Sequence, residues 1–299
     1  GLPPGIQLQV HLLRAAAQAD VGDAGAALKS IDEARAIDKS NVDVWLAEVP
    51  IRIRARQFKE AGVAADTALE LTPGSAEALY QKGAVAHVQG NLKAALEAYD
   101  RALAADTKHV EARVARIGIA MDQGRYADAS KDVAELQAAS PREPRAAYMK
   151  ALLAERSGDL AGSQAGLKQV TELLDPVPIE FMRYRPQMLM LNGLAHFGLR
   201  QSEKAKQYLE AFQRVQRSSP VVKLLARIYM ADGNFALAIN ALEPYLRVQP
   251  GDGQALTLLA NAHRASGRNA KAAALMQEAL KTQDNPAFRT TLGLSLIGD

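Results

Sequence analysis

The stretch AEALYQKGAVAHVQGNLKAALEAYDRALAADTKH, residues 76–109, contains in one copy the pattern that the rest of the chain repeats. Apolar or small residues recur every three or four positions on both sides of Gly90-Asn91. This spacing predicts one buried face on a helix in each half. Glycine accepts the left-handed backbone that ends a helix, and asparagine can cap the next one. The stretch therefore predicts a helix, a tight turn and a second helix.

The same unit recurs with a period of 34 residues. Small residues mark the middle of each unit at Ala27, Ala61, Ala95 and Ala129, and after one slip at Ala205, Ala238 and Ala272. Glycines keep the same spacing five residues earlier, at Gly22, Gly90, Gly124, Gly158, Gly233 and Gly267, and other residues replace this glycine in some units. A fixed period in this range indicates a stack of supersecondary units. We expect an all-α superhelix of about eight helical hairpins and a lone C-terminal helix.

Composition limits the classes of function. A stacked array can extend over 299 residues as one domain because each unit buries its apolar face on its neighbours. The formal charge of +3 is too small on this length to indicate nucleic acid as a partner. The chain has no cysteine, which excludes disulfides, thiolate metal sites and cysteine nucleophiles and leaves the redox compartment open.

Neither end of the chain predicts a membrane anchor. The most apolar stretches, Met188–Leu191 and Ala287–Ile297, are shorter than the ~20 residues that span a bilayer. The N-terminus lacks a methionine, a basic region and a long apolar run, so no signal peptide is visible. Pro286–Asp299 matches only the first helix of a ninth unit. We interpret the chain as a fragment of a longer array.

The pattern of small, apolar and aromatic positions resembles the tetratricopeptide repeat over nearly the whole chain. Trp45 occupies the opening aromatic position of that repeat, and Pro73, Pro141 and Pro250 its terminal proline. The resemblance implies a solenoid with units 8–41, 42–75, 76–109, 110–143, 144–177, 186–218, 219–252 and 253–286, an insertion at 178–185 and a half unit at 287–299, all in a single array spanning 1–299.

A more specific resemblance involves three segments, Arg145–Leu167, Ala241–Ala273 and Asn285–Asp299. They are similar to the large tetratricopeptide lipoprotein found with PEP-CTERM and exosortase exopolysaccharide systems. This resemblance implies a periplasmic or outer-membrane-associated place and a role in polysaccharide export. The lipidated cysteine of that family is absent here, and a cytoplasmic location stays open.

The common catalytic and metal-binding signatures are missing. No two of the five histidines have the helical spacing of a metal site with a third ligand nearby. No phosphate loop, nucleophile elbow or zinc-protease motif occurs. We therefore predict no enzyme, no cofactor and no metal. His196 and His263 replace the inner-face aromatic of their units, and we expect both to be packed and hydrogen-bonded.

The tetratricopeptide resemblance implies a concave groove lined by the first helix of each unit. Its lining positions carry Tyr80, His87, Tyr148, Arg156, Lys223, Arg227, Asn261 and Arg264. We expect Tyr80 and Tyr148 to be exposed in the groove, where aromatic rings anchor a peptide or stack on sugars. The cations near the C-terminus converge and suit a carboxylate or an acidic chain. The alternative is that they are ordinary solvated surface residues.

Two places depart from the regular pattern. The insertion Val177–Arg185 carries Phe181, Arg183, Tyr184 and Arg185. The favoured interpretation is a connector that packs Phe181 and Tyr184 on adjacent helices, and the alternative is a loop that contacts a partner. Pro50 lies inside a predicted helix, where proline removes a backbone hydrogen bond and costs ~3 kcal/mol. This predicts a local distortion with a packing or recognition role.

The leading hypothesis is a noncatalytic scaffold in bacterial exopolysaccharide or envelope export. It binds a protein or peptide partner, or a polysaccharide, through the groove. Two alternatives stay open: the repeat module of a larger enzyme such as a glycosyltransferase, and a cytosolic adaptor. An adaptor for chaperone tails is disfavoured, because Leu12 and Ala16 stand where such clamps need lysine and asparagine.

Overall fold

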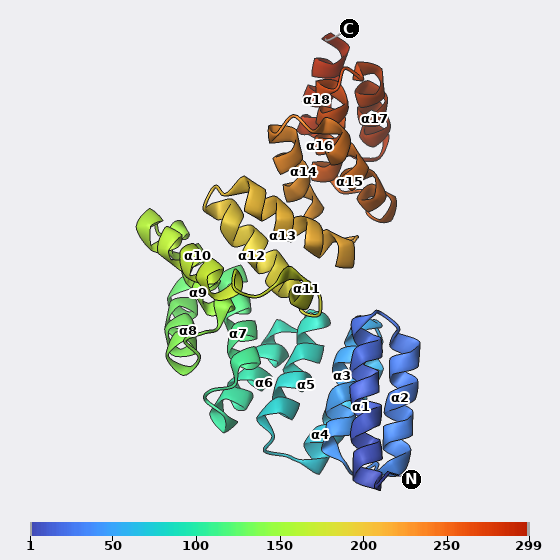
Figure 1. Cartoon of the computed structure of the whole chain (residues 1–299), viewed down its shortest axis with the longest axis vertical. Helices are drawn as coiled ribbons and strands as arrows, with labels where there is room; N and C mark the ends of the chain where they lie inside the picture. Colours follow the sequence, from blue (N-terminus) through green and yellow to red (C-terminus); the bar gives the residue numbers. More distant parts are fainter. Residues whose placement is uncertain (1, 298–299) are drawn as a thin grey trace. The chain divides into compact units, whose positions relative to one another are not determined.

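A computed structural model describes residues 2–297 of the chain, and over that range it is built from helices without strands (Figure 1). The predicted all-α class is confirmed. The helices are α1 (Pro4–Asp20), α2 (Ala24–Ile37), α3 (Val42–Arg54), α4 (Phe58–Leu71), α5 (Ala76–Val88), α6 (Leu92–Ala105), α7 (Val110–Asp122), α8 (Tyr126–Ala139), α9 (Pro144–Arg156), α10 (Leu160–Leu174), α11 (Ile179–Met182), α12 (Pro186–Gly198), α13 (Ser202–Val215), α14 (Val222–Ala231), α15 (Phe235–Val248), α16 (Gly253–Ala265), α17 (Asn269–Thr282) and α18 (Pro286–Ile297).

The helices form consecutive hairpins, as the repeat pattern predicts. Each hairpin has a first helix, such as α5, and a second helix, such as α6, packed against each other. First helices also contact the next first helix along the chain, for example α3 with α5 and α14 with α16. The one-turn helix α11 lies in the insertion, and α18 packs on α16 and α17 as the first helix of a further unit. Within residues 2–297, seven such pairs of helices are in contact, and α18 is the predicted lone helix.

The turns inside the hairpins have the predicted left-handed backbone. All six glycines of the 34-residue series have a positive φ, between 72° and 85°. Where a unit lacks this glycine, an arginine takes the same backbone conformation: Arg56 and Arg200 both have a φ of 59°. Because a side chain strains this conformation, the position is fixed by the two helices that flank it and not by the residue that occupies it.

Small residues let the two helices of a hairpin approach closely. Ala95 of α6 is fully buried, and a Cβ added to Gly83 of α5 would lie 2.5 Å from the ring of Tyr99. Gly193 of α12 has the same relation to Leu209 of α13, at 2.6 Å. In both contacts a small residue on the first helix receives a large side chain from the second.

Local chain chemistry explains the helix ends and one exception. Asn91 caps α6, as predicted, by accepting a hydrogen bond from the amide of Ala94 at 3.2 Å. Pro50 does not interrupt α3, which runs unbroken from Val42 to Arg54. The helix thus continues through Pro50, and the local distortion expected there stays a prediction. The carbonyl of Leu46 nevertheless loses its helical donor, because proline has no N–H.

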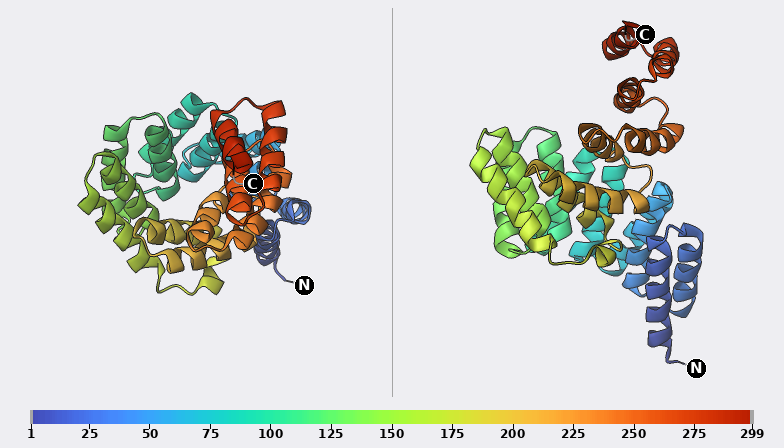
Figure 2. Two further views of the ribbon diagram at one scale, coloured as in Figure 1. Left: turned by 90° about the horizontal axis from the view of Figure 1, so that it is seen from above. Right: turned by 45° about the horizontal axis from the view of Figure 1, so that its top comes forward.

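The chain divides into two compact units, one ending at Leu153 and the other beginning at Ala154. In each unit the hairpins follow one another in chain order (Figure 2). A single continuous array over both units stays a prediction. Within residues 2–297, no helix combines the length and apolarity needed to cross a membrane.

Candidate interaction surfaces

In the first unit, the predicted groove residues lie in a packed polar and aromatic cluster. Tyr80 is half-buried, with its ring 5.9 Å from that of Tyr99 and 5.2 Å from that of His109. Burial raises the pKa of Tyr80 to about 12. His87 is also half-buried, and its Nδ1 lies 3.4 Å from the hydroxyl of Tyr99. Both side chains thus pack against neighbouring residues of the chain, and Tyr80 is less exposed to solvent than predicted.

A histidine–carboxylate hydrogen bond and an arginine ion pair join neighbouring first helices beside this cluster. His109 caps α7 through Nδ1, and its Nε2 lies 3.2 Å from the carboxylate of Glu77 on α5. The hydrogen bond between them lowers the pKa of Glu77 and raises that of His109. Arg145 donates two hydrogen bonds of 2.8 Å to Glu111 and also bonds Glu143. These residues hold successive repeats in register.

The two predicted groove residues on α9, Tyr148 and Arg156, differ in exposure and in the compact unit to which they belong. Tyr148 is half-buried and Arg156 is exposed, and both make contacts with the rest of the chain. Tyr148 belongs to the first compact unit and Arg156 to the second.

A small apolar cavity of about 160 Å³ lies between the first helices α1 and α3. Its lining includes three residues from predicted groove positions, Leu12, Ala16 and Pro50. Arg54 and Asp20 flank it and form an exposed ion pair of 3.5 Å. Pro50 thus contributes to an apolar wall on the first-helix side of two adjacent units.

In the second unit, the predicted cation cluster is only partly available to a ligand. Lys223 pairs with Asp252 at 2.8 Å, and the same carboxylate accepts a hydrogen bond of 2.7 Å from Tyr245 and caps α16. Burial alone would raise the pKa of Asp252, but Lys223, Tyr245 and the cap lower it to about 2. The expectation that Lys223 adds a free charge to the patch is wrong, because Asp252 neutralises it.

Arg227 and Arg264 have a different environment. Both side chains are exposed, and neither forms an ion pair or hydrogen bond with any part of the chain that the structure describes. Arg227 and the half-buried Asn261 are 34 residues apart, at equivalent positions of the contacting helices α14 and α16. Arg264 lies one turn beyond Asn261. These three residues form what we call the α14–α16 face.

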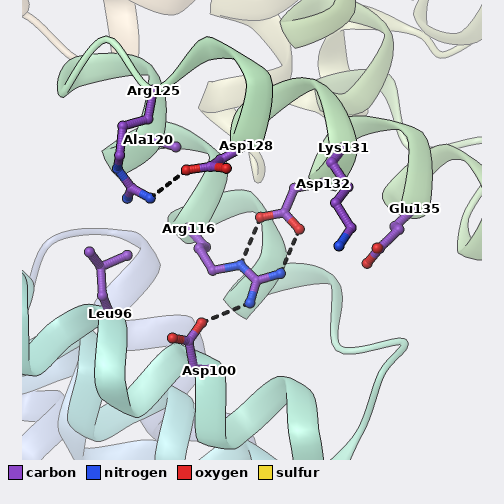
Figure 3. Close-up of a pocket in the computed structure, with 9 residues that line it drawn as sticks. All are labelled: Leu96, Asp100, Arg116, Ala120, Arg125, Asp128, Lys131, Asp132 and Glu135. Carbon is purple, nitrogen blue, oxygen red and sulfur yellow. Dashed lines mark hydrogen bonds and ion pairs between the residues drawn. The ribbon is translucent and has the colours of Figure 1, made fainter.

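The sequence analysis missed a buried charge network in the first unit. Arg116 of α7 donates to both oxygens of Asp132 on α8, at 2.7 and 2.5 Å, and to Asp100 on α6 at 2.7 Å (Figure 3). Arg113, itself buried, bonds Asp132 and Glu135. The cavity beside this network measures about 250 Å³. Its buried charges are neutralised internally, so the network ties α6, α7 and α8 together.

The repeat period contained the signal for part of this network. Lys82 pairs with Asp66 in the preceding hairpin, and Arg116 pairs with Asp100 in the same way, 34 residues later. A comparison of charges across units at this period would have predicted both pairs. Arg113 could not be predicted so simply, because it stands where a neighbouring unit has the buried Leu79.

A second polar network lies at the base of the insertion. Asp175, at the end of α10, accepts hydrogen bonds from Asn192 at 2.9 Å, His196 at 2.8 Å and Lys204 at 3.0 Å. These bonds outweigh the effect of burial, which alone would raise the pKa of Asp175, and lower it to about 2. His196 is only 1% exposed and stacks on Tyr208. Its predicted packed and hydrogen-bonded state is confirmed.

His263 behaves differently from His196. It is buried as predicted, but its Nδ1 has no hydrogen-bond partner, so the expected hydrogen bonding at that nitrogen is wrong. Burial lowers the pKa of His263, and the nearby charge of Arg268 lowers it further. The neutral imidazole is therefore the form that fits this apolar position.

The insertion contradicts the favoured interpretation from the sequence. Phe181 and Tyr184 do not pack on adjacent helices, since they are 68% and 61% exposed. Met182, between them, is the residue that packs inward, with 3% exposed. Arg183 and Arg185 are also exposed. The side chain that anchors the segment is the one that the sequence analysis did not single out.

No cluster of three or more histidine and acidic side chains with the arrangement of a metal site occurs within residues 2–297. The residues described above are arranged for packing, ion pairing and surface contact. Within residues 2–297, the α14–α16 face and the insertion both present exposed arginine side chains without a carboxylate partner.

Comparisons with known proteins agree with this architecture. A family model described as "Tetratricopeptide repeat" matches residues 46–109 and 223–287, and a second model with the same description matches residues 86–155. No curated protein sequence matches the chain significantly.

Among solved structures, a chain of the APC/C hetero-tetramer Cut9-Hcn1 matches with a TM-score of 0.65 and 16% identity, over 85% of this chain and 49% of that one. This chain thus spans about half the length of that relative. PilF of Pseudomonas aeruginosa matches with a TM-score of 0.52 and 19% identity, over 75% and 98%. PilW, a type IV pilus biogenesis factor, matches with a TM-score of 0.51 and 22% identity, over 73% and 95%. At these identities the likeness concerns the fold.

Proposed function

Because the chain belongs to the tetratricopeptide repeat family, whose repeats form protein-interaction scaffolds, we propose that it is a noncatalytic scaffold that binds a protein partner through the α14–α16 face. The observation that carries this proposal is the pair Arg227 and Arg264. Both guanidinium groups are exposed and unpaired within the described residues, while the nearby Lys223 is neutralised by Asp252.

The chemistry of this face favours an acidic segment of a partner. A guanidinium group offers a planar set of donors that matches a carboxylate in two parallel hydrogen bonds. Asn261 adds an amide that can donate to a backbone carbonyl of the same segment. An extended peptide with two acidic residues would therefore meet two cations and an amide on adjacent first helices.

We also propose that the scaffold acts in bacterial exopolysaccharide or envelope export, at a periplasmic or outer-membrane-associated location. The support for this is the sequence resemblance of residues 145–167, 241–273 and 285–299 to the tetratricopeptide lipoprotein of exosortase systems. The location can be tested by fractionating cells that express the tagged native gene. Recovery of the protein with the cytosolic fraction would exclude the export role.

The binding proposal is tested with the double variant Arg227→Glu and Arg264→Glu. Tagged wild type and variant are incubated with envelope extract from the native organism, cross-linked and analysed by quantitative mass spectrometry. We expect at least one protein with an acidic segment to be retained by the wild type and lost by the variant. The same proteins are titrated with purified exopolysaccharide to test the polysaccharide alternative.

The matched control is Arg247→Glu with Lys271→Glu, which changes the same charge on the exposed surface of the second helices α15 and α17. This control should retain the partner. Equal retention by wild type and the α14–α16 variant would refute the proposed face. If the chain binds polysaccharide and retains no protein, the ligand of this face is a polysaccharide and the proposed protein partner is wrong.

A further inference from the structure

We propose that the insertion, residues 177–185, is a second protein-binding surface, separate from the α14–α16 face. Its partner presents an apolar socket bordered by carboxylates. The proposal rests on the exposure of two aromatic rings, on positive charge beside them that has no carboxylate partner, and on the hydrogen bonds that hold the segment in place.

The aromatic rings of the insertion are exposed, although the residue between them is buried. Met182 is buried, while Phe181 and Tyr184 on either side of it in the sequence are exposed to solvent. Val177 adds further exposed apolar surface. Aromatic side chains dominate the binding energy of protein interfaces when a partner buries them. The insertion therefore offers two anchors of the kind that a socket receives.

The positive charge beside these rings indicates which charge the partner must carry. Arg183 and Arg185 are exposed, and neither has a carboxylate partner in the part of the chain that the structure covers. Glu180 is the acidic residue of the segment, so the arginines leave a local excess of positive charge. Carboxylates around the socket would complement this charge and orient the two surfaces.

Arg183 and Tyr184 also favour a protein over a sugar chain. The guanidinium of Arg183 lies over the ring of Tyr184 at 4.9 Å and donates a hydrogen bond of 2.8 Å to its hydroxyl. One face of the ring is thus covered, although a sugar would need an open face to stack on. Aromatic residues combined with arginine are the composition typical of protein interface centres.

The segment is held firmly at both ends. Asp175 joins the end of α10 to Asn192 and His196 of α12 on the other side of the insertion. Within the segment, the amide of Arg185 donates to the carbonyl of Met182 at 2.8 Å. A surface that is ordered before binding loses less conformational entropy in a complex.

A phage library of random dodecapeptides provides the probe. It is selected on the wild-type chain and counter-selected on the double variant Phe181→Ala and Tyr184→Ala. We expect enriched peptides that carry an apolar cluster flanked by aspartate or glutamate. Their synthetic forms should bind the wild type at least tenfold more tightly than either the aromatic variant or Arg183→Glu with Arg185→Glu, as measured by fluorescence anisotropy.

The matched control is Leu237→Ala with Val248→Ala, which removes exposed apolar surface from α15 and should leave peptide affinity unchanged. Circular dichroism verifies that all variants keep the wild-type helicity. The variant of the α14–α16 face, Arg227→Glu with Arg264→Glu, should bind these peptides as tightly as the wild type. A failure of one proposal can therefore be distinguished from a failure of the other. Enrichment of peptides without acidic residues, or of none, would overturn the inference. Binding of alginate that depends on Phe181 and Tyr184, without peptide binding, would also overturn it.

Discussion

Arg145 holds the carboxylate of Glu111, the residue one full repeat before it, with two hydrogen bonds of 2.8 Å. The two residues occupy equivalent positions in neighbouring units, so the pair joins one unit to the next. Asp20 and Arg54 are also 34 residues apart and form a longer pair at 3.5 Å. Stacking in this chain thus depends on charges that differ between otherwise similar repeats.

A double-mutant cycle with Glu111→Ala and Arg145→Ala should reveal this coupling. We expect the two changes to be less than additive by about 0.2–1 kcal/mol, because the pair is partly exposed but has ideal two-bond geometry. Urea unfolding monitored by circular dichroism measures the effect. The exposed pair Lys168–Glu172, which lies within a single helix, is the control and should show a coupling near the lower limit. Strict additivity at Glu111 and Arg145 would contradict the prediction.

The turn arginines predict stabilising substitutions. Arg56→Gly and Arg200→Gly should each raise the midpoint of thermal unfolding, because glycine adopts a φ near 59° without the side-chain strain of ~1–2 kcal/mol. The net gain should be below about 1 kcal/mol, since glycine loses more entropy on folding. Gly124→Ala, at the equivalent turn with a φ of 72°, should lower the midpoint. Arginine and glycine variants of equal stability would show that the turn is not under strain.

Ala95 tests the register of the helix pair. Ala95→Trp should destabilise the chain by about 1–3 kcal/mol or more, because the residue is fully buried between α5 and α6. Gly83→Ala should also destabilise it, since the added methyl group would clash with Tyr99. Gly5, which has open space around it, serves as the control for an added methyl group. Unchanged melting of the Ala95 variant would show that the assigned register is wrong.

Asp175 predicts an acid-sensitive contribution to stability. Asp175→Ala leaves donors of His196 and Asn192 buried without an acceptor, at a cost of about 1–3 kcal/mol for each group. The folded-state pKa of about 2 lies below the ordinary value of 3.8, so the carboxylate stabilises the fold above pH 3.8. This contribution is lost as the pH falls toward 2. Asp175→Asn should therefore reduce the loss of stability between those values, as measured by chemical unfolding at each pH.

The pair of Glu77 and His109 predicts stabilisation in a limited pH window. The pKa of Glu77 is lowered from 4.5, so its contribution is present above pH 4.5 and lost as the pH falls. The pKa of His109 is raised from 6.5, so its contribution is present below pH 6.5 and lost as the pH rises through the raised value. Glu77→Gln should thus reduce stability most between about pH 4.5 and 6.5. An equal effect at pH 9 would exclude the ionic interaction.

The fold could be predicted from the sequence because each unit repeats the same local rules. Small residues, turn glycines and helix spacing act over a few residues, and the 34-residue period showed them several times. Even Arg56 and Arg200, which break the glycine pattern, adopt the backbone that the pattern requires. The repeat itself defines the geometry, so one irregular residue does not alter it.

The candidate sites could be predicted only in part, because they depend on contacts between units. Arg227 and Arg264 are exposed, and their place in a groove stays a prediction. Lys223, which the sequence groups with them, instead pairs with Asp252, which lies 29 residues away. The burial of Met182, in place of Phe181 and Tyr184, depends on how the insertion packs against its neighbours in the fold. Local periodicity contains no information about that packing.

The contacts within each unit have a consequence for how the molecule unfolds. Helices there pack mainly on their nearest and next-nearest neighbours in the chain, as α5 does on α6 and α3. Such a structure gains its stability from a series of adjacent interfaces and has no central nucleus that all parts share. Hairpins at the ends can therefore open while inner ones stay folded. Hydrogen exchange should be fastest in the terminal helices and slowest in the middle of each unit, and denaturation should proceed in stages.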